Sequence, residues 1–122
     1  MLGLSFKAGT DDLRESPLVT LADRLISKGF QIKVYDPNVW HASKTEGANQ
    51  KYINENIAHI SKNLVENPGD LKSTANVFVI GNPNKDFAGV ISSVANDDSL
   101  VIDLVRLNAD IEKRKGYNGI CW

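Results

Sequence analysis

The chain has one cysteine among its 122 residues, Cys121, so no disulfide can form within it. No apolar run approaches the roughly 18 residues that a membrane-spanning helix needs. No basic stretch followed by a long apolar segment marks a secretory signal. The 14 basic and 15 acidic residues are scattered and leave a net charge of −1, which argues against a nucleic-acid-binding surface. We therefore expect a cytoplasmic domain without a nucleic-acid or membrane partner.

Two glycine signatures of nucleotide binding are also missing. Neither G-x-G-x-x-G nor G-x-x-x-x-G-K-[ST] occurs, so the chain has neither a complete dinucleotide fingerprint nor a P-loop. His41 and His59 have no cysteine or acidic residue at metal-ligand spacing. Cys121 has no nearby base that would activate its thiol. We expect no metal site and no catalytic residue in this segment.

The first third of the chain has the pattern of a strand, a helix and a second strand. Residues 1–6 are mostly apolar, as in a buried strand. Ser16-Pro17 is typical of a helix start, because serine caps the first turn and proline suits its first position. Gly29 is a helix stop, and apolar residues alternate with polar ones over 30–35. Such a β-α-β unit builds a parallel sheet.

The remaining pattern continues this alternation of strands and helices. We expect a loop with short helical turns over 39–60, a helix from near Asp70 to before Asn76, a strand over 77–80 with a Gly-Asn-Pro turn after it, a helix over 87–94 and a strand over 100–104. A polar tail ends the chain. The sequence predicts one domain over residues 1–122, a three-layer Rossmann-like α/β fold with a mainly parallel sheet. The first strand begins almost at Met1, and we interpret the chain as a domain of a longer polypeptide.

Five charged residues are crowded into the loop between the first strand and the first helix: Lys7, Asp11, Asp12, Arg14 and Glu15. Ligands of open α/β sheets bind beyond the carboxyl ends of strands, where this loop lies. Lys7 and Arg14 would suit phosphate groups, as a point charge and a bidentate fork. The alternative is a solvated turn in which the three acids neutralise Lys7 and Arg14. The residues alone leave both interpretations open.

Other charged residues are weaker candidates. Asp36 ends the second strand, where a Rossmann fold places its ribose-binding acid, but a turn-forming Asp-Pro explains it better. Asp103 and Arg106 follow a later strand and would either line the same crevice or form a structural ion pair. Asp97-Asp98 is typical of a turn between helix and strand.

Four segments carry a recognisable pattern: Gly3-Leu4-Ser5-Phe6-Lys7, Thr10-Asp11-Asp12-Leu13-Arg14-Glu15-Ser16-Pro17, Tyr35-Asp36-Pro37 and residues 73–80. This pattern closely resembles a signature of the UDP-glucose/GDP-mannose dehydrogenase family, in its C-terminal nucleotide-sugar-binding domain. The resemblance covers essentially the whole chain. The sequence Lys-Ala-Gly-Thr-Asp-Asp-Leu-Arg and the terminal Gly-Ile-Cys-Trp are most similar to the GDP-mannose branch of the family.

The resemblance implies that the intact enzyme oxidises the C6 alcohol of a sugar nucleotide, such as GDP-mannose, to a carboxylate with two NAD+ molecules. It also implies that NAD binds mainly to an N-terminal domain outside this segment, and that a helical region makes a homo-oligomer. By position, Lys7 would contact the sugar nucleotide and Arg14 would reach NAD, whereas Arg106 is only a shifted match to the family's base-contacting arginine. A UDP-sugar dehydrogenase and a stand-alone nucleotide-binding module are the alternatives. The segment alone is expected to be catalytically silent.

Overall fold

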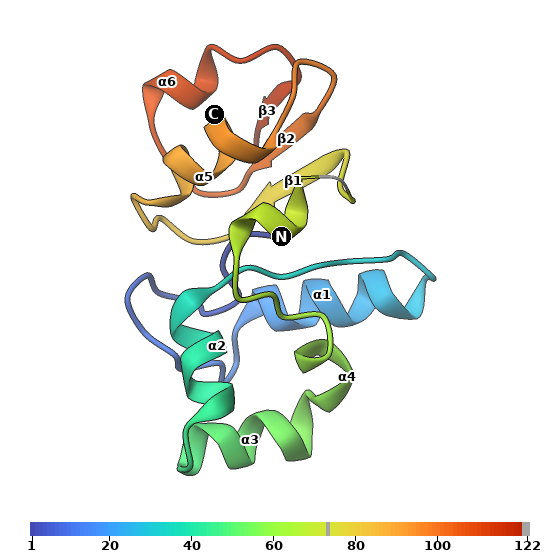
Figure 1. The fold of residues 1–122 in the computed structure, drawn as a ribbon, viewed down its shortest axis with the longest axis vertical. Helices are drawn as coiled ribbons and strands as arrows, with labels where there is room; N and C mark the ends of the chain where they lie inside the picture. The colour runs from blue at the N-terminus through green and yellow to red at the C-terminus, as the bar shows by residue number, and fades with distance from the viewer. Residues whose placement is uncertain (73, 121–122) are drawn as a thin grey trace.

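The computed structural model describes residues 1–72 and 74–120. Its elements, in chain order, are α1 (Pro17–Ser27), α2 (Pro37–Lys44), α3 (Ala48–Asn56), α4 (Ala58–Ser61), the 3-10 helix η1 (Pro68–Leu71), β1 (Val77–Ile80), α5 (Phe87–Val94), β2 (Leu100–Asp103), α6 (Ala109–Glu112) and β3 (Tyr117–Gly119). Figure 1 shows α1 to α4 gathered in one half of the molecule, and the three strands with α5 and α6 in the other. The N-terminal end lies between these halves (Figure 1).

The three strands form a parallel sheet in the order β1-β2-β3. Isolated parallel bridges extend this sheet beyond β1, because Leu2 pairs with both Ile80 and Tyr35, and Val34 pairs with Leu64. Backbone hydrogen bonds confirm the extension: the Leu2 N–H donates to the Val79 carbonyl at 2.7 Å. The full order of extended segments is therefore Leu64, Val34–Tyr35, Leu2, β1, β2 and β3.

In chain numbering this order is 3-2-1-4-5-6, the order of a Rossmann fold. The direction of winding reverses between the segment at Leu2 and β1. Each of these two segments is followed by a loop, residues 3–16 and 81–86. Both loops leave the carboxyl edge of the sheet from adjacent strands and then run in opposite directions. A crevice at this reversal is where doubly wound sheets bind ligands.

Two apolar clusters pack on the two faces of the sheet. One joins α1 to α4 with Met1, Val34 and Leu64. The other joins η1, α5 and α6 with Leu2 and with the fully buried strand residues Phe78, Ile80 and Val101, among others. Helices on both faces of a parallel sheet confirm the expected three-layer α/β architecture.

The first helix begins and ends as expected. The Ser16 hydroxyl accepts a hydrogen bond from the Leu18 N–H at 3.3 Å, and Pro17 occupies the first helical position. Gly29 follows the helix with φ +87°, a left-handed conformation that suits glycine. The expected strand over 77–80 and helix over 87–94 are also confirmed, and the strand expected over 100–104 ends one residue earlier.

Other expectations need correction. The strands expected over 1–6 and 30–35 are paired only near Leu2 and Val34–Tyr35, because the chain bends at Ser5 and Phe30 is 60% exposed. The loop expected over 39–60 is mostly helical, as α2, α3 and α4. Its start signal is Asp36-Pro37, since the Asp36 carboxylate accepts from the Val39 N–H at 3.2 Å and caps α2.

The two remaining errors lie nearer the end of the chain. The helix expected from Asp70 to before Asn76 is instead a 3-10 turn that begins two residues earlier, at Pro68, and ends at Leu71. The tail contains α6 and β3, which its polar composition did not indicate. Cys121 and Trp122 lie outside the described residues.

Candidate functional site

The candidate site is built on the loop over residues 3–16, which leaves the centre of the sheet. Its first residues are held by Asp36, a carboxylate that is only 2% exposed. Asp36 Oδ2 accepts hydrogen bonds from the Leu4 N–H at 2.9 Å and the Ser5 N–H at 3.2 Å, while Oδ1 caps α2. Asp36 therefore faces the protein interior and is not placed as a ribose-binding acid. The turn-forming interpretation is closer, although the residue starts a helix.

The same loop is held from its other side by Asn82, which follows β1 and is 2% exposed. Asn82 Nδ2 donates to the Ser5 carbonyl at 3.2 Å. Gly3 makes this approach possible: its φ is +86°, and a Cβ there would lie 2.6 Å from Asn82 Nδ2. A Cβ on Gly81 would likewise lie 3.0 Å from the Gly3 carbonyl oxygen. The two loops at the winding reversal are thus in close contact at their bases.

Beyond Ser5 the loop turns outward and encloses a hollow of about 360 Å³. Its lining is Phe6, Lys7, Ala8, Gly9, Thr10, Asp12 and Arg14. The structure therefore brings Lys7 and Arg14 to one concavity, within the size range of small-molecule sites. Lys7 is exposed, and its ammonium has no hydrogen bond or ion pair with the described residues. Phe6 is 70% exposed beside it.

Arg14 is paired with Asp12 in the wall of the hollow. Its Nε and Nη2 donate to the two carboxylate oxygens at 2.9 and 2.8 Å. These hydrogen bonds lower the pKa of Asp12 to about 2 and raise the pKa of Arg14. The pair supports the neutralising interpretation in part, yet Arg14 has five N–H donors and Asp12 uses two, so three remain. The Arg14 side chain is 72% exposed and can offer them to a ligand.

The loop closes with Glu15, whose φ is +56°. A non-glycine residue rarely adopts this left-handed conformation, which costs roughly 1–3 kcal/mol when the surroundings impose it. Ser16 imposes it here, since its hydroxyl donates to the Leu4 carbonyl at 2.8 Å and also caps α1. The end of the loop is thus anchored to its beginning.

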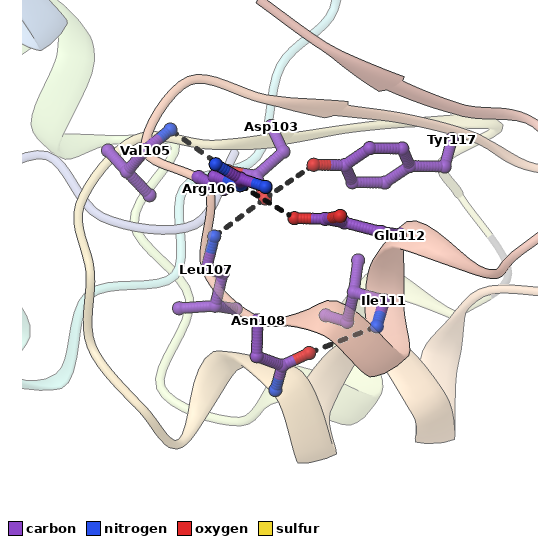
Figure 2. A network of polar contacts seen from close by, with 8 residues as sticks. All are labelled: Asp103, Val105, Arg106, Leu107, Asn108, Ile111, Glu112 and Tyr117. Carbon is purple, nitrogen blue, oxygen red and sulfur yellow. Dashed lines mark hydrogen bonds and ion pairs between the residues drawn. The ribbon is translucent and has the colours of Figure 1, made fainter. Parts of the chain in front are cut away.

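A second loop, after β2, is organised by Asp103 and not by an ion pair. Figure 2 shows this buried carboxylate accepting from the Val105 and Leu107 N–H groups, at 2.9 and 2.8 Å, and from the Tyr117 hydroxyl at 3.2 Å. Arg106, between the two bonded backbone groups, has φ +53° and pairs with Glu112 at 3.1 Å (Figure 2). The suggested Asp103–Arg106 ion pair is therefore wrong. Asp103 shapes the loop, and Arg106 is exposed on it.

The remaining candidates do not join the site. His59 pairs with Asp23 at 2.7 Å on the surface, a partner 36 residues away that the sequence spacing did not reveal. Asp97 and Asp98 lie in a turn, as expected. Within residues 1–72 and 74–120, no group of three or more metal-ligating side chains comes together, and no helix has the length and apolar character of a membrane span.

A larger hollow of about 780 Å³ lies elsewhere, at the amino end of the sheet. Met1, Phe30, Val65 and Val77 are among its mainly apolar lining residues, and the charged side chains in that lining are Lys33 and Lys62. By volume alone, this larger hollow would be the better candidate for the site. The loop at the winding reversal is the better candidate, because its cationic groups converge where the fold binds ligands.

Sequence reasoning missed Ser5 and Asn82, the two residues that hold the loop in place. The available signals were a serine inside an apolar run and an asparagine directly after a buried strand. Neither signal shows that two residues 77 positions apart meet in the interior.

Comparison with known proteins gives the site its context. The family model described as "UDP-glucose/GDP-mannose dehydrogenase family, UDP binding domain" matches residues 1–109. The chain belongs to this family. Its curated relatives include GDP-mannose 6-dehydrogenase of Pseudomonas putida, 46% identical over 123 residues, and that of Pseudomonas aeruginosa, 43% identical over 122 residues. Both alignments cover 100% of this chain but 28% and 27% of the relatives.

A solved structure agrees with this family assignment. The chain is similar to GDP-mannose dehydrogenase from Pseudomonas aeruginosa in a ternary complex, with a TM-score of 0.86 and 41% sequence identity. The match covers 99% of this chain and 27% of that one. The chain thus spans about a quarter of the length of its dehydrogenase relatives, and it corresponds to the family's UDP binding domain.

Proposed function

We propose that this chain is the nucleotide-sugar-binding domain of an NAD-dependent GDP-mannose 6-dehydrogenase, which oxidises GDP-mannose to GDP-mannuronate in two steps. The observation that carries this proposal is the hollow lined by Lys7 and Arg14 at the winding reversal, in a chain 46% identical to a GDP-mannose 6-dehydrogenase. The substrate, NAD and the remaining domains of the intact enzyme are the partners in this proposal. We place the intact enzyme in the cytoplasm as a homo-oligomer.

Lys7 is the proposed ligand of the sugar nucleotide. A sugar nucleotide carries a diphosphate, and the Lys7 ammonium is a compact cation with no partner among the described residues. It lies in a hollow that is lined by one loop, so the opposite side of a bound ligand would remain exposed. Residues outside this chain would cover that side in the intact dehydrogenase.

Arg14 is the proposed contact to the cofactor. NAD, when bound, accepts the hydride that leaves C6 of the sugar. Arg14 keeps three N–H donors that Asp12 does not use, and these donors suit a negatively charged group of such a dinucleotide. The chain lacks the glycine fingerprint that would hold the pyrophosphate on a helix start. Arg14 would therefore assist a cofactor bound mainly by the N-terminal domain.

The alternative substrate is a UDP-sugar, which the description of the matching family model favours by its words "UDP binding domain". Both sugar nucleotides carry the diphosphate that Lys7 would contact, so the charged loop does not separate them. The base does. A steady-state assay of the intact dehydrogenase that follows NADH with GDP-mannose and with UDP-glucose distinguishes the two functions.

Replacement of Lys7 tests its role in the intact dehydrogenase. We expect Lys7→Ala to lower kcat/KM for the sugar nucleotide roughly tenfold or more, since a charge-assisted hydrogen bond contributes about 1.5–3 kcal/mol. The melting temperature should change little because the side chain is exposed. Lys115→Ala, at an exposed lysine before β3, is the matched control and should leave kcat/KM unchanged. An unchanged kcat/KM in Lys7→Ala would contradict the proposed role.

The 122-residue chain by itself is proposed to fold without catalysing. Its two apolar clusters give it a core, and no catalytic nucleophile with an activating base is assigned to it. The purified chain should melt cooperatively and produce no NADH with any sugar nucleotide. NADH production that persists in Cys121→Ser would overturn this assignment.

A further inference from the structure

Three buried polar side chains meet behind the Lys7 hollow, and the proposed function uses none of them. Ser5, Asp36 and Asn82 are 1%, 2% and 2% exposed. They follow the three central extended segments of the sheet, those at Leu2, at 34–35 and at β1. Buried polar groups destabilise a fold unless they are hydrogen-bonded. These groups satisfy one another and so form a single polar cluster.

Ser5 is the centre of this cluster, because all its polar atoms are bonded. Its N–H donates to Asp36 Oδ2 at 3.2 Å, and its carbonyl accepts from Asn82 Nδ2 at 3.2 Å. Its hydroxyl oxygen lies 3.3 Å from both Asp36 Oδ2 and Asn82 Nδ2. The hydroxyl also lies 3.1 Å from the Lys7 carbonyl oxygen, to which it can donate. The loop is thus fixed from both neighbouring strands just before Lys7.

This fixation matters because the Lys7 side chain makes no hydrogen bond or ion pair of its own with the described residues. The backbone therefore determines the point from which this side chain extends into the hollow. The residues after it give little support: Gly9 has φ +77° and no atom within 4 Å of a Cβ placed on it. The hydrogen bonds at Ser5 are therefore the last tertiary constraint before the cation.

We propose that Ser5, Asp36 and Asn82 are positioning residues that hold Lys7 in the orientation the sugar nucleotide needs. This inference rests on the proposed function of Lys7. The cluster touches no ligand, and it acts by reducing the orientations of the loop that must be lost on binding. Its removal should therefore change the same kinetic parameter that removal of Lys7 changes.

The test is Ser5→Ala in the intact dehydrogenase, with Ser99→Ala as its control. Ser99 is 2% exposed, and its hydroxyl is hydrogen-bonded at 3.0 Å to the Asn96 N–H and to Asn96 Oδ1, at the amino end of β2. Both variants lose a buried hydroxyl, so similar decreases in melting temperature are expected. Ser5→Ala should raise KM for GDP-mannose, or lower kcat/KM, roughly five- to tenfold. Ser99→Ala should change neither. Equal kinetic losses in the two variants would overturn the proposal.

A double-mutant cycle separates this inference from the function on which it rests. In the Lys7→Ala background, Ser5→Ala should cause no further kinetic loss, because the cation it orients is absent. Additive losses would contradict positioning through Lys7. If Lys7→Ala leaves kcat/KM unchanged in an active enzyme, the proposed role of Lys7 fails and the positioning role fails with it. If Lys7→Ala lowers kcat/KM but Ser5→Ala does not, only the positioning role fails.

A second variant covers the case in which Ser5→Ala does not fold. Asn82→Ala removes the donor to the Ser5 carbonyl from a different loop. It should give the same kinetic change and the same lack of additivity with Lys7→Ala. A folded Asn82→Ala enzyme with unaltered kcat/KM would also overturn the proposal.

Discussion

Replacement of Asp36 by alanine should be among the most destabilising single changes in this chain. The carboxylate is 2% exposed, accepts from the Leu4 and Ser5 N–H groups and caps α2 through the Val39 N–H. Each buried N–H left without a partner costs about 1–3 kcal/mol, and loss of a cap costs about 1 kcal/mol. We expect Asp36→Ala to lower the free energy of unfolding by about 3–7 kcal/mol.

Urea and thermal unfolding of the 122-residue chain, followed by circular dichroism, measure this loss. At about 4 °C per kcal/mol for a domain of this size, the melting temperature should fall by roughly 12–28 °C. Asp36→Asn keeps the shape and one acceptor oxygen, so about 1–2 kcal/mol is expected. Asp97→Ala, at an exposed turn, is the control and should change stability by less than about 0.5 kcal/mol. A loss below about 1 kcal/mol in Asp36→Ala would refute the structural role of the carboxylate.

Three further predictions concern the same loop. Arg14→Lys in the intact dehydrogenase should weaken NAD binding in calorimetry, because lysine keeps the charge but not the planar fork; normal NAD affinity with early unfolding would show that the arginine is structural. The depressed pKa keeps Asp12 charged down to a pH of about 2, so any stability from its pair with Arg14 is fully present above the ordinary carboxyl pKa of 3.8 and is lost progressively as the pH falls from there to about 2. An NMR titration should show this midpoint, and Arg14→Ala should return it towards the ordinary range. Gly3→Ala should destabilise the chain more than Gly9→Ala in urea unfolding, because both have positive φ but only Gly3 approaches Asn82; equal losses would contradict this packing.

Local signals in the sequence were sufficient for the elements that have both a boundary residue and a dense apolar pattern. The first helix has Ser16-Pro17 at its start, Gly29 after its end and apolar residues at helical spacing between them. β1 is a continuous apolar run followed by a turn. Such elements are specified by their own residues.

Other elements depend on contacts that no local pattern reveals. Asp36-Pro37 has the same cap-and-proline form as Ser16-Pro17, but the apolar residues after it are sparse, and α2 was missed. β3 is a Tyr-Asn-Gly sequence with the composition of a turn, and it is a strand because it pairs with β2. Tertiary pairing overrides local preference there.

The site divides in the same way. The charged loop and its position beyond a strand could be predicted, and the structure places Lys7 and Arg14 on one hollow. Their roles stay predictions. The buried contacts that shape the loop could not be predicted, because Ser5 meets Asp36 and Asn82 only after three segments of the sheet are assembled.

Calorimetric titration of the intact dehydrogenase with GDP-mannose and with UDP-glucose tests the central claim most directly. We expect GDP-mannose to bind at least about tenfold more tightly, and Lys7→Ala to reduce that binding by a similar factor, since about 1.4 kcal/mol corresponds to tenfold. Equal or tighter binding of UDP-glucose, or GDP-mannose binding that is unaltered in Lys7→Ala, would contradict the account.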